Sequence, residues 1–388
     1  MTATLTRRAF LGAELPPDAE AFTSEGMLVA GIVEGGMAMR AGLLPGDLVT
    51  LFAKLPTRNL SELAAALRAA GQGSTTQLMF VRGGDLYVRE VSVIPLARAP
   101  GVTYGEHAGL RTLSTNPASP RALIVFLQGI ACESVDTPLA DTPLEALIAA
   151  WTAAGYATLR FDKRGIGDSS GGSCRDAGFT SELADARAIV EHAASIAGGI
   201  PIVLFGHSVG GIIAPQLAEH ARALMVYGTP VMPWFDCLQD SIRRQLELRG
   251  ADARTIDDEM AKLARLADEG ELNGRSAAYH RELGAVDIAA AWRGVKCPVL
   301  VARGEHDWVV RADDQARIAS LSGEDAGELG SMTRGLARGP VSIVDLPALD
   351  HLFGAHADRG ASLRDYGVGA PTDSLARATL DWLARVIR

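Results

Sequence analysis

The spacing of hydrophobic and polar residues changes near residue 100, and the change predicts a chain built in two parts. In the first part, short runs of alternating apolar and polar residues are separated by glycine-rich turns, a pattern typical of half-buried strands. A helical spacing over residues 60–70 begins at Ser61 and Glu62. Residues 1–95 are therefore predicted to form a small α+β domain. Its strands are expected at residues 28–33, 47–52, 76–81 and 86–93.

Beyond residue 104, compact apolar runs alternate with longer helical patterns. Such alternation is typical of β-α-β units, in which helices cover both faces of a largely parallel sheet, so the predicted fold class is α/β. Residues 96–103, which include Pro100, are expected to link the two domains. In this part strands are expected at residues 123–127, 157–161, 201–205, 224–227, 299–302 and 341–344, and helices at residues 143–155 and 181–197.

Composition and charge exclude several classes of protein. The chain has 388 residues, more than one ordinary core requires, which favours two domains. Its 37 basic and 46 acidic residues give a net charge of -9, and the basic residues are scattered, so nucleic acid is not expected as a partner. No apolar run approaches the roughly 20 residues of a membrane-spanning helix, so no membrane span is expected.

Four cysteines lie far apart in the sequence: Cys132, Cys174, Cys237 and Cys297. They form no C-x-x-C pair and have no histidine at metal-site spacing, so no metal ion is expected. We interpret all four as unpaired thiols of a protein in the reducing cytoplasm.

The stretch TRRAFLG, residues 6–12, permits two interpretations. Its arginine pair, Arg7 and Arg8, is similar to that of a twin-arginine export signal. An export signal also needs an apolar segment of about 7–15 residues after its charged start. That place holds charged residues and prolines between Glu14 and Glu20, so a cytoplasmic location is predicted.

The most informative motif is GHSVGG at residues 206–211. It lies between the expected strand at 201–205 and a helical pattern at 212–220. A G-x-S-x-G sequence in that context is a nucleophile elbow, a strained turn that raises a serine clear of the backbone. Ser208 is therefore the candidate nucleophile.

A serine hydroxyl needs a base, and the base needs a carboxylate that fixes its tautomer. Asp307 in GEHDWVV and His351 in LDHLFG each follow an expected strand, where a parallel sheet presents catalytic groups. These two residues are predicted to complete a triad with Ser208. The rivals are Glu305 and Asp236 for the acid and His356 and His306 for the base. Of these, His356 is expected on the surface and His306 beside the acid.

A tetrahedral oxyanion needs two preorganised donors. The backbone N–H of Val209, which directly follows the nucleophile, is expected to be one. The other is expected from the loop after residues 123–127, with the Ile130 N–H as the candidate. Cys132 would lie near the mouth of the site, although a packing role is an alternative.

Residues from about 100 to 388 resemble an α/β-hydrolase, because DKRGIGDSSG, GHSVGG, GEHDWVV and LDHLFG occur in that order. The motifs are similar to those of bacterial serine hydrolases near the prolyl-oligopeptidase and acyl-transferase-like esterase branches. The resemblance implies hydrolysis of a small ester or thioester through an acyl-enzyme at Ser208, without metal or organic cofactor. A serine peptidase or aminopeptidase is the alternative. Asp162, Lys163 and Arg164 are expected to brace the floor of the site through ion pairs.

Residues 232–291 are rich in helix formers and occupy the place where these enzymes carry a lid. The hydrolase domain is therefore predicted to span residues 104–388 with a helical lid insertion. Trp234 and Tyr279 are candidates to line the substrate pocket, and packing of the lid onto the core is the alternative.

The stretch AMRAGLLPGDLV, with the order of elements around it, resembles a PDZ domain of the bacterial arrangement. The resemblance implies that the loop Phe10, Leu11, Gly12 and Ala13 binds the C-terminal carboxylate of a partner. Arg7 and Arg8 would support that carboxylate or be solvated. A PDZ-centred adaptor with a non-catalytic hydrolase scaffold is a further alternative.

All candidate triad and oxyanion residues lie beyond residue 120. The PDZ-like domain is therefore expected to serve targeting or substrate presentation. A chain that starts near Pro100 is expected to retain activity on small esters, provided that this domain does not roof the site.

Overall fold

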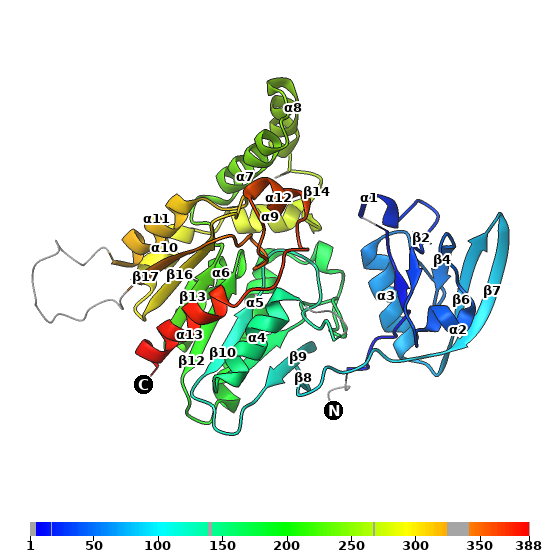
Figure 1. Cartoon of the computed structure of the whole chain (residues 1–388), viewed down its shortest axis with the longest axis horizontal. Helices are drawn as coiled ribbons and strands as arrows, with labels where there is room; N and C mark the ends of the chain where they lie inside the picture. Colours follow the sequence, from blue (N-terminus) through cyan, green and yellow to red (C-terminus); the bar gives the residue numbers. More distant parts are fainter. Residues whose placement is uncertain (1–4, 17, 139–141, 267, 324–340, 388) are drawn as a thin grey trace, which may run out of the picture.

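The computed structural model describes residues 5–16, 18–138, 142–266, 268–323 and 341–387. It places a small N-terminal domain beside a larger domain built on one extended sheet (Figure 1). The first segment of the chain and the linker run side by side between them, because Leu96 N–H donates to Arg8 O at 2.9 Å and Ala9 bridges Pro95. None of the described helices is long and apolar enough to cross a membrane.

The N-terminal domain combines a five-stranded antiparallel sheet with the helix α3 (Leu60–Gly71). The Asn59 side chain accepts a hydrogen bond from Glu62 N–H and so begins α3, whose Leu63 and Ala66 pack on Phe52 and Phe80 in the core. The other elements are β1 (Ala13–Glu14), α1 (Asp18–Ala21), β2 (Met27–Leu28), β3 (Gly31–Ile32), α2 (Met37–Ala41), β4 (Leu48–Phe52), β5 (Leu55–Pro56), β6 (Thr75–Arg82) and β7 (Asp85–Ser92).

The single strand predicted at residues 28–33 is wrong, since the chain changes partners in the middle of it. Val29 N–H donates to Asp47 O, whereas Ala30 N–H donates to Glu14 O. As a result β2 pairs with β4 in the main sheet, and β3 pairs with β1 in a separate two-stranded ribbon.

The larger domain contains an eight-stranded sheet in the order β17-β16-β13-β12-β10-β11-β9-β8. Neighbouring strands from β17 to β11 are parallel, and β9 and β8 are added antiparallel at one edge. The two edge strands, rich in polar residues, were missed by the apolar pattern. The strands are β8 (Thr103–His107), β9 (Leu110–Thr115), β10 (Leu123–Leu127), β11 (Ala157–Phe161), β12 (Ile202–His207), β13 (Ala223–Tyr227), β16 (Val299–Gly304) and β17 (Val341–Leu346).

Helices cover both faces of this sheet, as the alternation of patterns predicted. In β10, Ile124 and Phe126 face the cluster formed with α4 (Pro143–Ala153) and α13 (Ser374–Val386), whereas Val125 faces the cluster formed with α5 (Phe179–Ile196). Because both faces are buried, the strand is continuously apolar. The remaining elements are η1 (Cys174–Asp176), α6 (Gly210–Ile213), η2 (Ala214–His220), α10 (Ile288–Gly294), α11 (Ala312–Gly323) and α12 (Arg359–Arg364).

The insertion between β13 and β16 is mainly helical, and α7 and α8 project beyond the end of the sheet (Figure 1). It contains α7 (Trp234–Leu248), α8 (Ala253–Leu263), the short hairpin β14 (Glu271–Leu272) and β15 (Arg275–Ser276), and α9 (Ala277–Gly284).

Candidate active site

Ser208 lies on a strained turn between β12 and α6. Its φ of 53° is in the left-handed region, and its N–H donates to Tyr227 O at 2.9 Å. A Cβ on Gly206 would lie only 2.6 Å from Gly210 O, and a Cβ on Gly211 would collide with the Thr229 side chain. The turn therefore leaves no room for a side chain at Gly206 or Gly211, and it raises Ser208 clear of the backbone.

His351 and Asp307 are in direct contact at the ends of neighbouring strands. His351 Nδ1 lies 2.8 Å from Asp307 Oδ2, and both side chains are buried. Asp307 Oδ1 accepts the N–H groups of Val309 and Val310 at 2.7 and 3.1 Å. Burial alone would raise the pKa of Asp307, but His351 and these N–H donors lower it overall. Asp307 is therefore an anion fixed to orient an imidazole.

The four rival residues do not form this arrangement. Asp236 is exposed on α7, and the Glu305 carboxylate lies 3.3 Å from Ala348 N. His306 Nδ1 is paired with the backbone oxygen of His356 at 3.0 Å. The expected surface position of His356 is wrong, because its side chain is 5% exposed and pairs with the buried Asp350 at 3.0 Å. The structure thus brings together Asp307 and His351 rather than any rival pair.

His207, which precedes the nucleophile, was not singled out from the sequence. Its Nε2 lies 2.8 Å from His351 O, so a neutral ring that carries its proton on Nε2 donates this bond. Burial, reinforced by His351, lowers the pKa of His207 to about 3. The ring therefore stays neutral near pH 7 and ties the elbow to the loop of the candidate base.

The loop after β10 passes beside the elbow. A Cβ on Gly129 would lie 3.2 Å from the Cβ of Ser208. Within the described part of the chain, neither the Ile130 N–H nor the Val209 N–H has a hydrogen-bond acceptor. Both candidate oxyanion donors are therefore available to a ligand at Ser208.

Long-range side chains hold this loop. Lys163 Nζ donates to Gly129 O, and Arg275 Nε donates to Ile130 O at 2.9 Å. Both cations form ion pairs with Glu182, and Lys163 Nζ lies 2.8 Å from Glu182 Oε1. Burial lowers the pKa of Lys163 to about 8, although Glu182 opposes the shift. The DKRG stretch thus braces the site as predicted, since Lys163 bonds directly to the loop and Arg164 forms an ion pair with Asp185.

The prediction of four unpaired thiols is wrong for two of them. Cys132 and Cys174, which are 42 positions apart in the sequence, form a disulfide that links the loop after β10 to η1. Cys237 and Cys297 are free, and burial raises the pKa of Cys297 to about 11. The disulfide removes part of the argument for a reducing compartment, so the cytoplasmic location stays a prediction.

The three candidate substrate-binding residues have different surroundings. Cys132 lines a cavity of about 690 Å³ between the two domains, bounded by Leu60, Ser61 and Ala64 of α3 and by Cys174 and Gly274 of the larger domain. The triad does not line this cavity. Trp234 is 5% exposed and bonds to His280, and Tyr279 is fully buried. Both therefore pack the insertion onto the core in this structure, and a role for either in lining a substrate pocket stays a prediction.

The predicted peptide-binding loop has the geometry of a convergent turn. Gly12 has φ of 69°, and the carbonyl oxygens of Phe10 and Leu11 accept the N–H groups that begin α2. No acceptor is found among the described residues for the N–H groups of Leu11 and Gly12. The chain continues through Ala13 into β1. By contrast, the expected role of Arg7 and Arg8 at this loop is wrong, since both pair with aspartates of the larger domain.

A family model described as serine aminopeptidase, S33, matches residues 118–331, more than half of the chain. The chain belongs to this serine hydrolase family. A PDZ-domain model matches residues 28–78, so the protein is an α/β-hydrolase with an N-terminal PDZ domain. Comparison with curated protein sequences gives no match.

Solved structures of esterases are among those similar to this chain. Est1E from Butyrivibrio proteoclasticus with bound ferulic acid is 18% identical, with 74% of this chain and 99% of that chain covered and a TM-score of 0.50. The Pyrococcus furiosus esterase Pf2001 is 14% identical over 74% and 91% of the two chains, with a TM-score of 0.48. An esterase domain from Rhodothermus marinus is 19% identical over 73% and 97%, with a TM-score of 0.44.

Proposed function

We propose that this family member hydrolyses a small carboxylic ester or thioester through an acyl-enzyme at Ser208. The contact between His351 and Asp307, at strand ends next to a strained serine turn, is the observation that supports it most strongly. A scaffold without catalytic function has no need for such strain or for a buried anion beside an imidazole. The adaptor alternative is therefore less well supported.

In the proposed mechanism His351 Nε2 takes the proton of Ser208 as its Oγ attacks the acyl carbon. Asp307 holds the Nδ1 proton and stabilises the imidazolium that forms. The N–H groups of Val209 and Ile130 bind the oxyanion of the tetrahedral intermediate. When that intermediate collapses, the bond to the leaving group breaks and His351 protonates the departing alcohol or thiol. Water then attacks the acyl-enzyme by the same route and releases the carboxylic acid.

A substrate panel and one variant test this proposal. The wild-type protein and Ser208→Ala are incubated with a fluorophosphonate probe, p-nitrophenyl esters, acyl thioesters, a ferulate ester and aminoacyl anilides. Wild type should label and should cleave esters or thioesters, whereas Ser208→Ala should lose labelling and about 10³-fold or more in kcat with its fold intact. Cleavage of the anilides alone would establish the aminopeptidase alternative, and near-native activity of Ser208→Ala would refute the mechanism.

We further propose that the PDZ domain docks a partner by its C-terminus. The free N–H groups of Leu11 and Gly12 support binding of a carboxylate, and β1 pairs only with β3 within the described residues. The open edge of β1 suits an added peptide strand. Titration of the full chain with C-terminal peptides should give binding that amidation of the peptide terminus abolishes. Binding that is indifferent to amidation would contradict this docking mode.

A further inference from the structure

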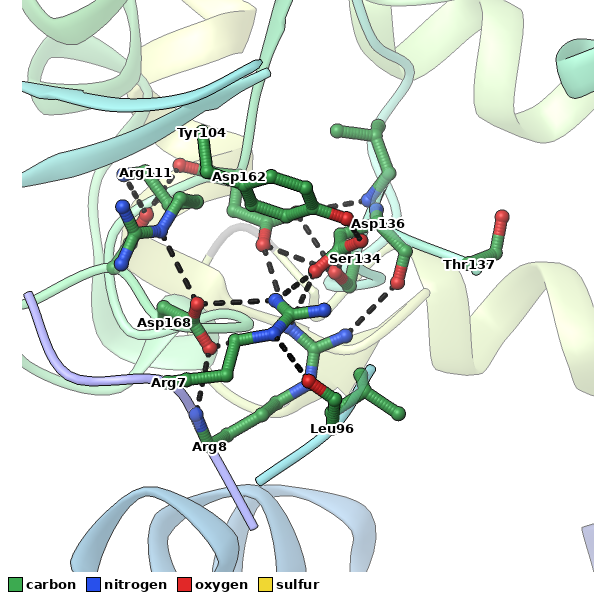
Figure 2. A network of polar contacts seen from close by, with 12 residues as sticks. Arg7, Arg8, Leu96, Tyr104, Arg111, Ser134, Asp136, Thr137, Asp162 and Asp168 are labelled. Carbon is green, nitrogen blue, oxygen red and sulfur yellow. Dashed lines mark hydrogen bonds and ion pairs between the residues drawn. The ribbon is translucent and has the colours of Figure 1, made fainter. Parts of the chain in front are cut away.

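Two arginines at the start of the PDZ domain are inserted into an acidic site of the hydrolase domain. Figure 2 shows the guanidinium groups of Arg7 and Arg8 between Asp136, Asp162 and Asp168. Arg7 Nη1 pairs with Asp136 and lies 3.0 Å from Asp168, while its Nε and Nη2 donate to linker carbonyls at 2.9 and 2.7 Å. The arginine therefore fastens the N-terminal segment, the linker and the hydrolase domain to one another.

Arg8 makes the contacts that reach furthest into the hydrolase domain. Its backbone N–H donates to Asp168 Oδ1 and its Nη2 donates to Asp136 O, both at 2.9 Å. Its Nη1 lies 3.5, 3.7 and 3.6 Å from carboxylate oxygens of Asp136, Asp162 and Asp168. One guanidinium group from the PDZ domain thus faces three carboxylates of its neighbour.

The three aspartates depend on cations because they are buried. Their side chains are between 0 and 1% exposed. Asp168 has a further partner in Arg111 at 3.1 Å, but within the described residues Asp136 and Asp162 have ion pairs with Arg7 or Arg8 alone. Loss of one member of a buried pair leaves the other charge uncompensated, which is far more costly than loss of an exposed pair.

One of these aspartates, Asp162, fixes the loop that carries the candidate oxyanion donor Ile130, and Asp136 lies within that loop. Asp162 Oδ1 accepts Val135 N–H at 2.8 Å and the Ser134 hydroxyl at 2.9 Å. Arg8 itself holds the next carbonyl, that of Asp136. The segment from Ile130 to Asp136 is therefore anchored at its distal end by an aspartate that the PDZ domain neutralises and by a direct bond from that domain.

We propose that Arg7 and Arg8 are positioning residues of the hydrolase, which hold the oxyanion loop through Asp136 and Asp162; this inference rests on the proposed function. The PDZ domain is then a structural part of the catalytic unit rather than a separable targeting module. The expectation that a chain starting near Pro100 retains activity on small esters is replaced by the prediction that this activity falls, because that chain lacks both arginines.

The test uses Arg8→Gln in the full chain. Arg82→Gln is the matched control, since Arg82 pairs with Asp47 inside the PDZ domain at 2.7 Å and touches no hydrolase residue in the described contacts. Arg8→Lys is a milder second variant that keeps a cation. Each protein is assayed on an oxygen ester and on the matching thionoester, whose sulfur is a weak hydrogen-bond acceptor and gains little from an oxyanion hole.

Arg8→Gln should lower kcat on the oxygen ester about tenfold or more with KM within about twofold, and should lower kcat on the thionoester much less. Arg8→Lys should be intermediate, and Arg82→Gln should match wild type. Equal losses on both esters, or an Arg8→Gln protein with wild-type kcat, would overturn the inference.

Amide hydrogen exchange separates this inference from the proposed function, since it requires no turnover. Exchange over residues 129–136 should accelerate in Arg8→Gln and stay unchanged in Arg82→Gln. If wild type hydrolyses no ester but exchange still accelerates in this segment, the proposed function fails and the positioning role stands. Unchanged exchange in that segment would refute the positioning role whatever the activity.

Discussion

The two sides of the candidate active site are held in different ways. Ser208, His351 and Asp307 follow the ends of three parallel strands of one mixed sheet, and their supporting contacts come from that sheet and its adjoining turns. The oxyanion loop, in contrast, is held by groups that are distant in sequence. They are Lys163, the disulfide to Cys174, Arg275 of the insertion, and Arg7 and Arg8 of the PDZ domain.

The oxyanion loop is the side of the site that groups outside the hydrolase domain can influence. The geometry of Ser208, His351 and Asp307 does not depend on the PDZ domain, since it is determined by strand register and by glycines that permit no side chain. The oxyanion loop is coupled to the PDZ domain by charge, and Arg8 lies two residues before the proposed peptide-binding loop. A change in the PDZ domain can therefore alter how the oxyanion loop stabilises the transition state, whereas it does not reach the nucleophile directly.

We expect the greatest loss of activity from a change in Asp307. Asp307→Asn should lower kcat by about 10³–10⁴-fold, because an amide no longer fixes the imidazole tautomer. The fold should persist, since the Asn oxygen can still accept the N–H groups of Val309 and Val310. The measurement is kcat together with a melting curve. Glu305→Gln is the matched control on the same loop.

Glu305 is exposed, and the control should therefore keep wild-type kcat. A mild effect of Asp307→Asn combined with a strong effect of Glu305→Gln would transfer the role of the acid to Glu305. It would also show that the nucleophile side is less fixed than its contacts indicate.

The residues of the candidate site that lie at strand ends could be located from the sequence. Apolar runs predicted β10, β12, β16 and β17, and Ser208, Asp307 and His351 follow three of those strands. Local pattern was therefore sufficient to place these residues at strand ends, and their catalytic roles stay a prediction. The fold class followed from the alternation of strands and helices in the same way. These features depend on residues that are close together in the chain.

Apart from the bracing by the DKRG stretch, the contacts that hold the oxyanion loop could not be predicted, because they join distant residues. Arg8 and Asp136 are 128 positions apart, and nothing in the stretch around Arg7 and Arg8 distinguishes a buried cation from an export signal or a solvated pair. Cys132 and Cys174 carry no spacing motif, so their disulfide was equally invisible. Only the folded chain shows which aspartates face the arginines.

The ionisation of Asp162 should make the contribution of Arg8 depend on pH. Burial raises the pKa of Asp162 to about 6, while Arg8 and the hydrogen bonds from Ser134 and Val135 oppose the shift and Asp136 adds to it. A carboxyl group whose pKa is raised by folding favours the fold when protonated, and that contribution is lost as pH rises through about 6. The need for Arg8 should therefore be greater at pH 8 than at pH 5.

A double-mutant cycle of Arg8→Gln and Asp162→Asn measures the charge coupling between the PDZ domain and the oxyanion loop. Its readouts are the free energy of unfolding and kcat at pH 8 and pH 5. At pH 8 the two substitutions should be coupled by about 1–3 kcal/mol, because Asp162→Asn removes the buried charge that Arg8→Gln leaves unpaired. The double variant should then have a higher kcat than Arg8→Gln alone, and the coupling should shrink at pH 5. Additive effects at pH 8, or a coupling that is equal at both pH values, would contradict the claim that charge pairing between the domains holds the oxyanion loop.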